Sequence, residues 1–231
     1  MISVQAVKKV YKNVTVLDVE QLFIGQNESF GLVGNNGAGK TTLFRMMLDL
    51  IRPTSGKIEI NGKNVQGDDE WKSYVGSFLD EGFLIPYLTP DEYFRFVGKL
   101  HNYSEADLKN FYTKFEELFH GEISGKDKYI GDLSKGNLKK VGIAAAFMGN
   151  PQMIMLDEPF ENLDPTSQIR LKNLLQEERK QRNFTYLISS HDLNHVTEIC
   201  ERIVILEKGS VIKDLKGNHN MLAELEEYFK A

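Results

Sequence analysis

Residues 34–42 read GNNGAGKTT, and they constrain the fold of this chain more than any other stretch. Gly34, Gly39, Lys40 and Thr41 match the spacing G-x-x-x-x-G-K-[ST] of a P-loop. A short apolar run precedes the stretch and a helical pattern follows it, which is the order that the motif requires. Glycines are needed because several main-chain N–H groups must point at one anion, and side chains would hold the backbone away. The stretch therefore predicts a phosphate-binding loop.

The loop and the helix after it supply different kinds of contact. Unpaired N–H groups at the start of a helix, with its positive dipole end, stabilise a buried anion by up to ~2 kcal/mol. Lys40 adds a full charge for the β- and γ-phosphates, and the Thr41 hydroxyl is suited to Mg²⁺. The residues expected to bind the nucleotide here are Gly34, Asn35, Asn36, Gly37, Ala38, Gly39, Lys40, Thr41 and Thr42.

Bulk properties narrow the possible classes of protein. The 231 residues allow one large domain, or one domain with an inserted lobe. A net charge of −5 gives no global basic character for binding nucleic acid. A single cysteine, Cys200, excludes an internal disulfide and fits a reducing compartment. The start shows no signal peptide and no apolar run reaches the length of a membrane span, so we expect a cytoplasmic protein.

The order of patterns along the chain predicts an α/β fold. Residues 2–24 read as two strands joined by a short turn, which favours an antiparallel pair before the P-loop. Residues 88–121 switch to helical patterns with clear helix starts, and their aromatic residues recur at the spacing of a core-facing stripe. We expect a P-loop NTPase with a mixed sheet core, an N-terminal antiparallel β-subdomain and an inserted helical subdomain. The chain would be a single domain, 1–231. Residues 1–81 and 151–231 would form the β-subdomain and the α/β core, and residues from about 82 to 150 would form the helical subdomain.

Two further stretches place chemical groups at the end of an apolar strand. Residues 153–159 read MIMLDEP, so Asp157 and Glu158 follow a buried strand at the sheet edge where α/β proteins bind ligands. Asp157 is predicted to hold Mg²⁺ and Glu158 to polarise the water that attacks the γ-phosphate. His191 follows another apolar strand, and a histidine there can contact the γ-phosphate and orient the water. We predict Lys40, Glu158 and His191 as the catalytic residues.

Two other candidates have ordinary structural alternatives. Tyr11 lies at the early turn, where it could stack on an adenine ring or simply be a turn tyrosine. The stretch Leu133-Ser-Lys-Gly-Asn137 precedes a helical pattern from about Asn137 to Met148, and by itself it reads as a helix cap.

Taken together, these motifs resemble the nucleotide-binding subunit of ATP-binding cassette (ABC) transporters over nearly the whole chain. The resemblance includes Tyr11, the P-loop, the 133–137 stretch, Asp157-Glu158, the 162–164 loop and His191, all in the order found in the family. It implies ATP and Mg²⁺ as cofactors and a second nucleotide-binding subunit as partner, in a homodimer or a heterodimer. Ser134, Lys135 and Gly136 would then bind the γ-phosphate of the nucleotide on the partner's P-loop.

The chain departs from the family pattern at three places. Lys135 stands where the family usually has glycine, and Asn137 where it usually has glutamine. The glutamine that contacts Mg²⁺ in the family is replaced by Asp80 or Glu81, and we take Thr41, Asp80 and Asp157 as the expected metal ligands. Degenerate signatures of this kind also occur in members that pair with a different partner.

The resemblance implies an ATPase that drives transport through a separate transmembrane permease. The subunit would be cytoplasmic and peripheral on the inner face of the cell membrane, without nucleic acid. Residues 83–96, FLIPYLTPDEYFRF, are the candidate contact with the permease, and residues 76–92 resemble bacterial drug and peptide exporters. The alternatives are a soluble cassette ATPase acting on DNA or ribosomes, and a module that binds nucleotide without hydrolysing it.

Overall fold

The core of the computed structural model, which describes residues 1–217 and 221–230, is a six-stranded sheet in the order β10-β9-β3-β8-β7-β6. Its strands are β3 (Ser29–Val33), β6 (Val75–Phe78), β7 (Met153–Asp157), β8 (Thr185–Ser190), β9 (Arg202–Glu207) and β10 (Ser210–Lys216). All neighbouring strands are parallel except β9 and β10, which makes the sheet mixed as expected. β3, β7 and β8 are buried along their whole length, which explains why they read as unbroken apolar runs.

A second, antiparallel sheet has the order β2-β1-β4-β5 and is formed by the early part of the chain. It contains β1 (Ile2–Tyr11), β2 (Val14–Ile24), β4 (Ser55–Ile60) and β5 (Lys63–Asn64). The turn between β1 and β2 consists of Lys12 and Asn13, both with positive φ, as a two-residue hairpin requires. The predicted antiparallel pair is therefore confirmed.

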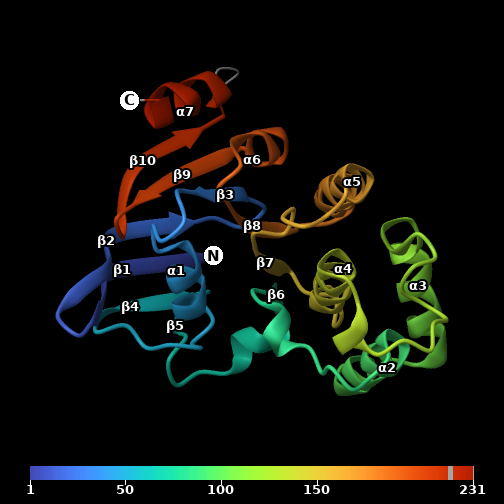
Figure 1. Cartoon of the computed structure of the whole chain (residues 1–231). Helices are drawn as coiled ribbons and strands as arrows, with labels where there is room; N and C mark the ends of the chain where they lie inside the picture. The colour runs from blue at the N-terminus through green and yellow to red at the C-terminus, as the bar shows by residue number, and fades with distance from the viewer. Residues whose placement is uncertain (218–220, 231) are drawn as a thin grey trace.

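The two faces of the six-stranded sheet are covered differently: one by helices only, the other by the antiparallel sheet together with one helix (Figure 1). Alternate residues of β7 show the division: Ile154 and Leu156 pack with the helices α4–α7, and Met153 and Met155 pack with α1 and the antiparallel sheet. The helices of this body are α1 (Lys40–Met47), α4 (Lys135–Ala146), α5 (Pro165–Gln181), α6 (Leu193–Ile199) and α7 (Met221–Lys230).

A helical part lies on the far side of α4 from the six-stranded sheet (Figure 1). It is formed by α2 (Pro90–Leu100) and α3 (Glu105–Phe119), with short 3-10 turns η2 (Glu81–Phe83) and η3 (Ile130–Asp132) at its borders. Capping boxes at Thr89 and Ser104 start the two helices. Phe111, Phe115 and Phe119 are buried, so the aromatic stripe is a core face as predicted.

One predicted helix start was late by about two residues. α4 begins at Lys135 and not at about Asn137. In α4 the reason is Ser134, whose side chain accepts a hydrogen bond from Asn137 N and caps the helix directly. No helix among the described residues is both long and apolar enough to cross a membrane.

Candidate functional site

The P-loop connects β3 to α1 and is held closely against its neighbours. A Cβ on Gly34 would lie 2.2 Å from the main-chain oxygen of Leu206, so only glycine fits at that position. Gly39 precedes α1 with a φ of 107°, which also favours glycine. Asn35, Asn36 and Gly37 are exposed and form an open rim. The loop thus has the backbone freedom and the open face that an anion site requires.

Lys40 is almost fully buried at the base of this loop. Its ammonium donates hydrogen bonds to the main-chain oxygens of Gly34 at 2.6 Å and Asn35 at 3.4 Å. It also lies 3.2 Å from Glu158 Oε1. The predicted P-loop lysine and the predicted catalytic carboxylate are therefore brought into direct contact.

Asp157 lies at the C-terminal end of β7, beside the first turn of α1. The Thr41 hydroxyl donates to Asp157 Oδ2 at 2.5 Å, and the Ser189 hydroxyl donates to Asp157 Oδ1. Burial raises the pKa of the Asp157 carboxyl, and the two hydrogen bonds partly oppose this shift. A hydroxyl and a carboxylate in contact are the oxygen donors that Mg²⁺ prefers, so Thr41 and Asp157 fit the predicted metal site.

The third predicted metal ligand, Asp80, has other partners. One of its carboxylate oxygens accepts from Gly82 N at 2.7 Å, and the other lies 3.6 Å from Arg45 Nη2. Glu81, in contrast, lines a cavity of about 430 Å³ together with Thr41 and Asp157. Of the two carboxylates that replace the family's glutamine, Glu81 is therefore the better placed.

Glu158 lies between the other two predicted catalytic residues. Its Oε2 is 2.9 Å from His191 Nδ1, and its Oε1 faces Lys40. Oε1 is buried, and within the described part of the chain it accepts no hydrogen bond despite its ion pair with Lys40. The charge of this oxygen is balanced by the Lys40 ammonium at 3.2 Å.

Ser189 was missed by the sequence reasoning, although it joins the two carboxylate residues. Its hydroxyl contacts Asp157 and accepts a hydrogen bond from Glu158 N at 3.0 Å. The sequence held no signal for this contact, because it depends on strand register: Ser189 pairs with Asp157 across β8 and β7.

The residues of the 133–137 stretch lie at the start of α4. Ser134 and Lys135 are exposed, and Lys135 lines the same cavity as Asp157 and Glu158. A Cβ on Gly136 would lie 2.7 Å from the main-chain oxygen of Asn162, so the helix start and the 162–164 loop approach closely. Ser134 and Gly136 do not line the cavity of their own chain.

Tyr11 ends β1 at the tip of the first hairpin and is 48% exposed. The Lys9 ammonium lies 4.7 Å from the centre of its ring, so the ring already makes one cation–π contact. The following strand, β2, reaches the P-loop, because Val16 O lies 3.1 Å from the position of a Cβ on Gly39. Contact between β2 and the P-loop therefore keeps the hairpin tip close to the phosphate-binding loop.

Comparisons with known proteins show the family of this chain. The family model described as "ABC transporter" matches residues 17–161, more than half of the chain. An uncharacterised ABC transporter ATP-binding protein of Synechocystis is 33% identical over 82% of this chain and 53% of its own length. The bacitracin transport ATP-binding protein BcrA of Bacillus licheniformis is 32% identical over 91% of this chain and 68% of its own length.

A similar solved structure is the ATP-binding cassette MJ0796 in a dimeric post-hydrolysis state bound to ADP and Pi. It is 25% identical, has a TM-score of 0.80, and the match covers 94% of this chain and 99% of that chain. The chain belongs to the ABC transporter family. It spans between about half and two thirds of the length of the curated relatives named above.

Proposed function

We propose that this chain is the ATP-binding and ATP-hydrolysing subunit of a transporter and converts ATP and water to ADP and phosphate. The observation that carries the proposal is the position of Glu158 between Lys40 and His191, beside the contact of Thr41 with Asp157. Many NTPases share a P-loop, but this combination also provides a group that activates water. It disfavours a module that only binds nucleotide.

Each side chain has a separate role in this proposal. The loop 34–42 and Lys40 bind the phosphates, and Mg²⁺ held by Thr41 and Asp157, with Glu81 nearby, neutralises phosphate charge. Glu158 accepts the proton of the attacking water while His191 orients it. Tyr11 stacks on the adenine with the face that Lys9 leaves open.

The site of one chain is completed by a second copy or a related subunit. Ser134 and Lys135 are exposed at the N-terminal end of α4, whose unpaired N–H groups and dipole favour an anion. Because Ser134 and Gly136 do not line their own chain's cavity, we infer that they bind the γ-phosphate held by the partner's P-loop. The dimeric state of a similar cassette supports this arrangement.

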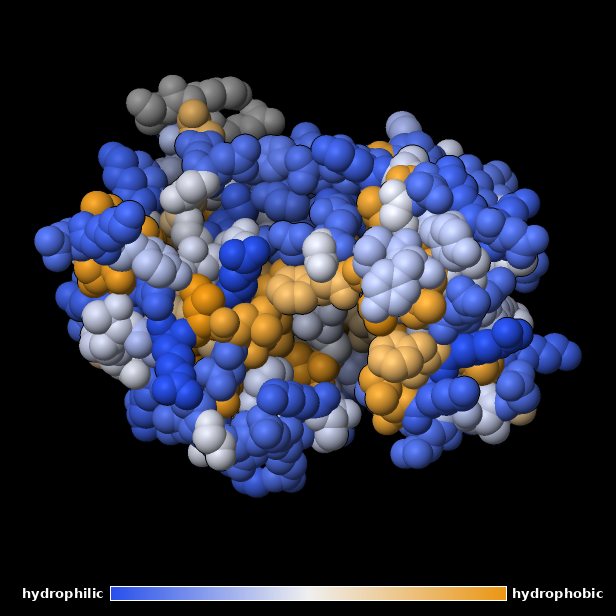
Figure 2. Space-filling view, turned by 60° about the horizontal axis from the view of Figure 1, so that its bottom comes forward, coloured by the Kyte–Doolittle hydropathy of each residue, from blue (hydrophilic) through white to orange (hydrophobic). Residues whose placement is uncertain are grey.

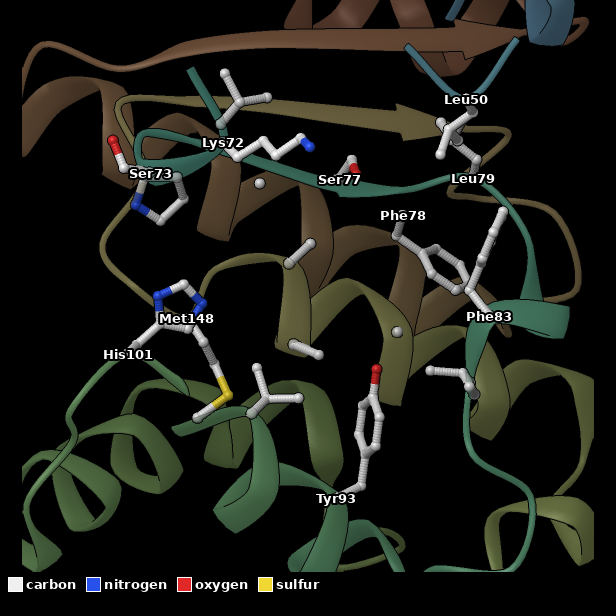
Figure 3. Close-up of a pocket in the computed structure, with 18 residues that line it drawn as sticks. Leu50, Lys72, Ser73, Ser77, Phe78, Leu79, Phe83, Tyr93, His101 and Met148 are labelled. Carbon is white, nitrogen blue, oxygen red and sulfur yellow. The ribbon is translucent and has the colours of Figure 1, made fainter. Parts of the chain in front are cut away.

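An apolar groove lies between β6, η2 and α2. It has a volume of about 340 Å³ and is lined mainly by apolar side chains, with Phe78 and Phe83 on one side and Tyr93 on the other (Figure 3). On the face shown in Figure 2, hydrophobic side chains gather around a hollow near the centre. We infer that the groove receives a cytoplasmic helix of a separate permease. This contact would hold the chain on the inner face of the membrane.

The relatives favour transport over the other sequence-based alternative. BcrA is named as a bacitracin transport protein, and other relatives are named for glycine betaine or methionine transport. We therefore propose a membrane transporter in place of a soluble ATPase acting on DNA or ribosomes. The likeness to BcrA favours the bacterial drug and peptide type.

Hydrolysis is tested by phosphate release from the purified chain with ATP and Mg²⁺. Wild type should turn over, and chelation of Mg²⁺ should stop it. Glu158→Gln should lower kcat by about 10² to 10⁴-fold, because it removes the proton acceptor, and should leave ATP binding intact. Wild-type turnover in Glu158→Gln would show that another group activates the water.

A further inference from the structure

Lys139 is a buried cation that no motif of the sequence assigns. It lies on α4, one turn after Lys135, and its residue is 4% exposed. A buried ammonium is unfavourable unless charged or polar partners replace the water that it loses. Its partners therefore show what the position contributes to the site.

The partners of Lys139 come from the segments around the proposed catalytic carboxylate. Its ammonium donates a hydrogen bond of 2.7 Å to the main-chain oxygen of Glu158. It also lies 3.9 Å from Glu81 Oε1 and 3.9 Å from Glu161 Oε2. All four residues line the cavity that contains Thr41 and Asp157. One ammonium thus joins α4, η2 and the loop after β7.

The hydrogen bond matters because of the backbone conformation of Glu158. This residue has a φ of 46°, in the left-handed region that non-glycine residues rarely adopt. Ser189 Oγ holds its N–H, and Lys139 holds its carbonyl oxygen. The two contacts fix the peptide groups on both sides of the residue whose carboxylate must face Lys40 and His191.

The structure assigns Lys139 as a positioning residue for ATP hydrolysis, an inference that rests on the function proposed above. Its ammonium holds the main chain of Glu158 so that the carboxylate stays between Lys40 and His191. It also balances the negative charge of Glu81 and Glu161 at the cavity. Lys139 acts through Glu158 and needs no contact with the nucleotide.

The neighbouring residue offers a matched control. Lys140 follows on the same helix, is 3% exposed, and pairs with Glu122 Oε2 at 3.0 Å and Asp164 Oδ2 at 3.9 Å. Neither partner is one of the residues that Lys139 contacts. Replacing Lys140 also removes a buried ammonium from its carboxylate partners, but away from Glu158.

The experiment compares Lys139→Met and Lys140→Met in the full chain by steady-state ATPase kinetics and thermal unfolding. We expect both variants to lose stability, but only Lys139→Met to lose about 10-fold or more in kcat with KM nearly unchanged, since small misplacements of a reacting group are costly. Lys139→Arg should recover most of the rate because it keeps a charged donor. In a Glu158→Gln background, Lys139→Met should cause no further loss, because coupled residues are not additive.

Wild-type kcat in Lys139→Met would overturn the assignment, as would an equal loss in Lys140→Met or an additional loss in the Glu158→Gln background. If Lys139→Met does not fold, Lys139→Gln is the second variant, because its shorter and uncharged side chain weakens the hold on the Glu158 carbonyl oxygen. A several-fold fall in its kcat supports the assignment, and an unchanged rate overturns it. A wild-type chain that binds ATP but never hydrolyses it would instead refute the proposed function itself.

Discussion

At the scale of single residues, the site depends on contacts between the ends of different strands. The sequence could identify Lys40 from the P-loop spacing. It could identify Asp157, Glu158 and His191 because they follow apolar strands, and carboxyl ends of parallel strands share an edge. It could not identify Ser189, which reaches Asp157 only through strand register. Their roles in binding and hydrolysis remain predictions, for which the geometry supplies support.

The choice between Asp80 and Glu81 as a metal ligand stays a prediction and shows the same limit. Two adjacent carboxylates are equivalent in the sequence, and a turn decides which of them faces the cavity. Asp80 caps η2 with its side chain, while Glu81 lines the cavity. The sequence could suggest that Asp80 caps a helix. Which of the two carboxylates faces the cavity depends on where α4 and β7 lie, and only the structure shows this.

Tyr11 gives a test at this scale. Tyr11→Ala removes the ring and should weaken ATP binding by about 1–3 kcal/mol, whereas binding of inorganic triphosphate should not change. Calorimetric titration of both ligands measures the difference, and Tyr11→Phe should bind ATP like wild type because it keeps the ring. Equal weakening for both ligands would mean that the hairpin only supports the P-loop.

At the scale of elements, the pattern of strands and helices was predictable, and their starting residues were less so. β7 and β8 are short apolar runs followed by polar residues, so the sequence predicts them as strands at these positions. The start of α4 depends on the cap at Ser134 and on the contact of Gly136 with the 162–164 loop, which is a tertiary contact. The boundaries proposed for the helical part, about 82–150, stay a prediction.

The groove beside η2 is also formed by elements that are distant in sequence. β6, η2, α2 and α4 together enclose it, and Phe83 lines it while 58% exposed. Leu84, the next residue of the predicted contact segment, is 7% exposed and belongs to the core. Of this adjacent pair, Phe83 is the residue that a partner can reach.

Phe83→Asp should therefore release a co-expressed permease while the ATPase activity of the free chain stays near that of wild type. A charged carboxylate in an apolar contact loses its hydration, so the complex is destabilised. Phe23→Asp is the control, because Phe23 lies on β2, outside the candidate contact segment, is 45% exposed and does not line the groove. Co-purification of the permease with Phe83→Asp in wild-type amounts would place the contact elsewhere.

At the scale of the whole molecule, we propose that the P-loop and the start of α4 form two halves of one kind of site. In this proposal the P-loop half binds phosphates through Lys40, and the other half uses Ser134 and Lys135, which are exposed to the solvent. The sequence predicted family and fold class, and the family model and solved structures confirm both. The sequence could not decide between a homodimer and a heterodimer. The positive charge of Lys135 could attract the phosphate held by a second copy or by a different subunit.

The most direct test of the central claim is the mass of Glu158→Gln in solution, measured by sedimentation with and without ATP and Mg²⁺. Binding without hydrolysis should hold two chains together, so ATP should convert monomers to dimers, and ADP should not. Ser134→Arg should prevent the dimer while leaving ATP bound to the P-loop, since it blocks the surface offered to the partner. A Glu158→Gln chain that binds ATP and stays monomeric at every concentration would contradict a site shared between two identical chains.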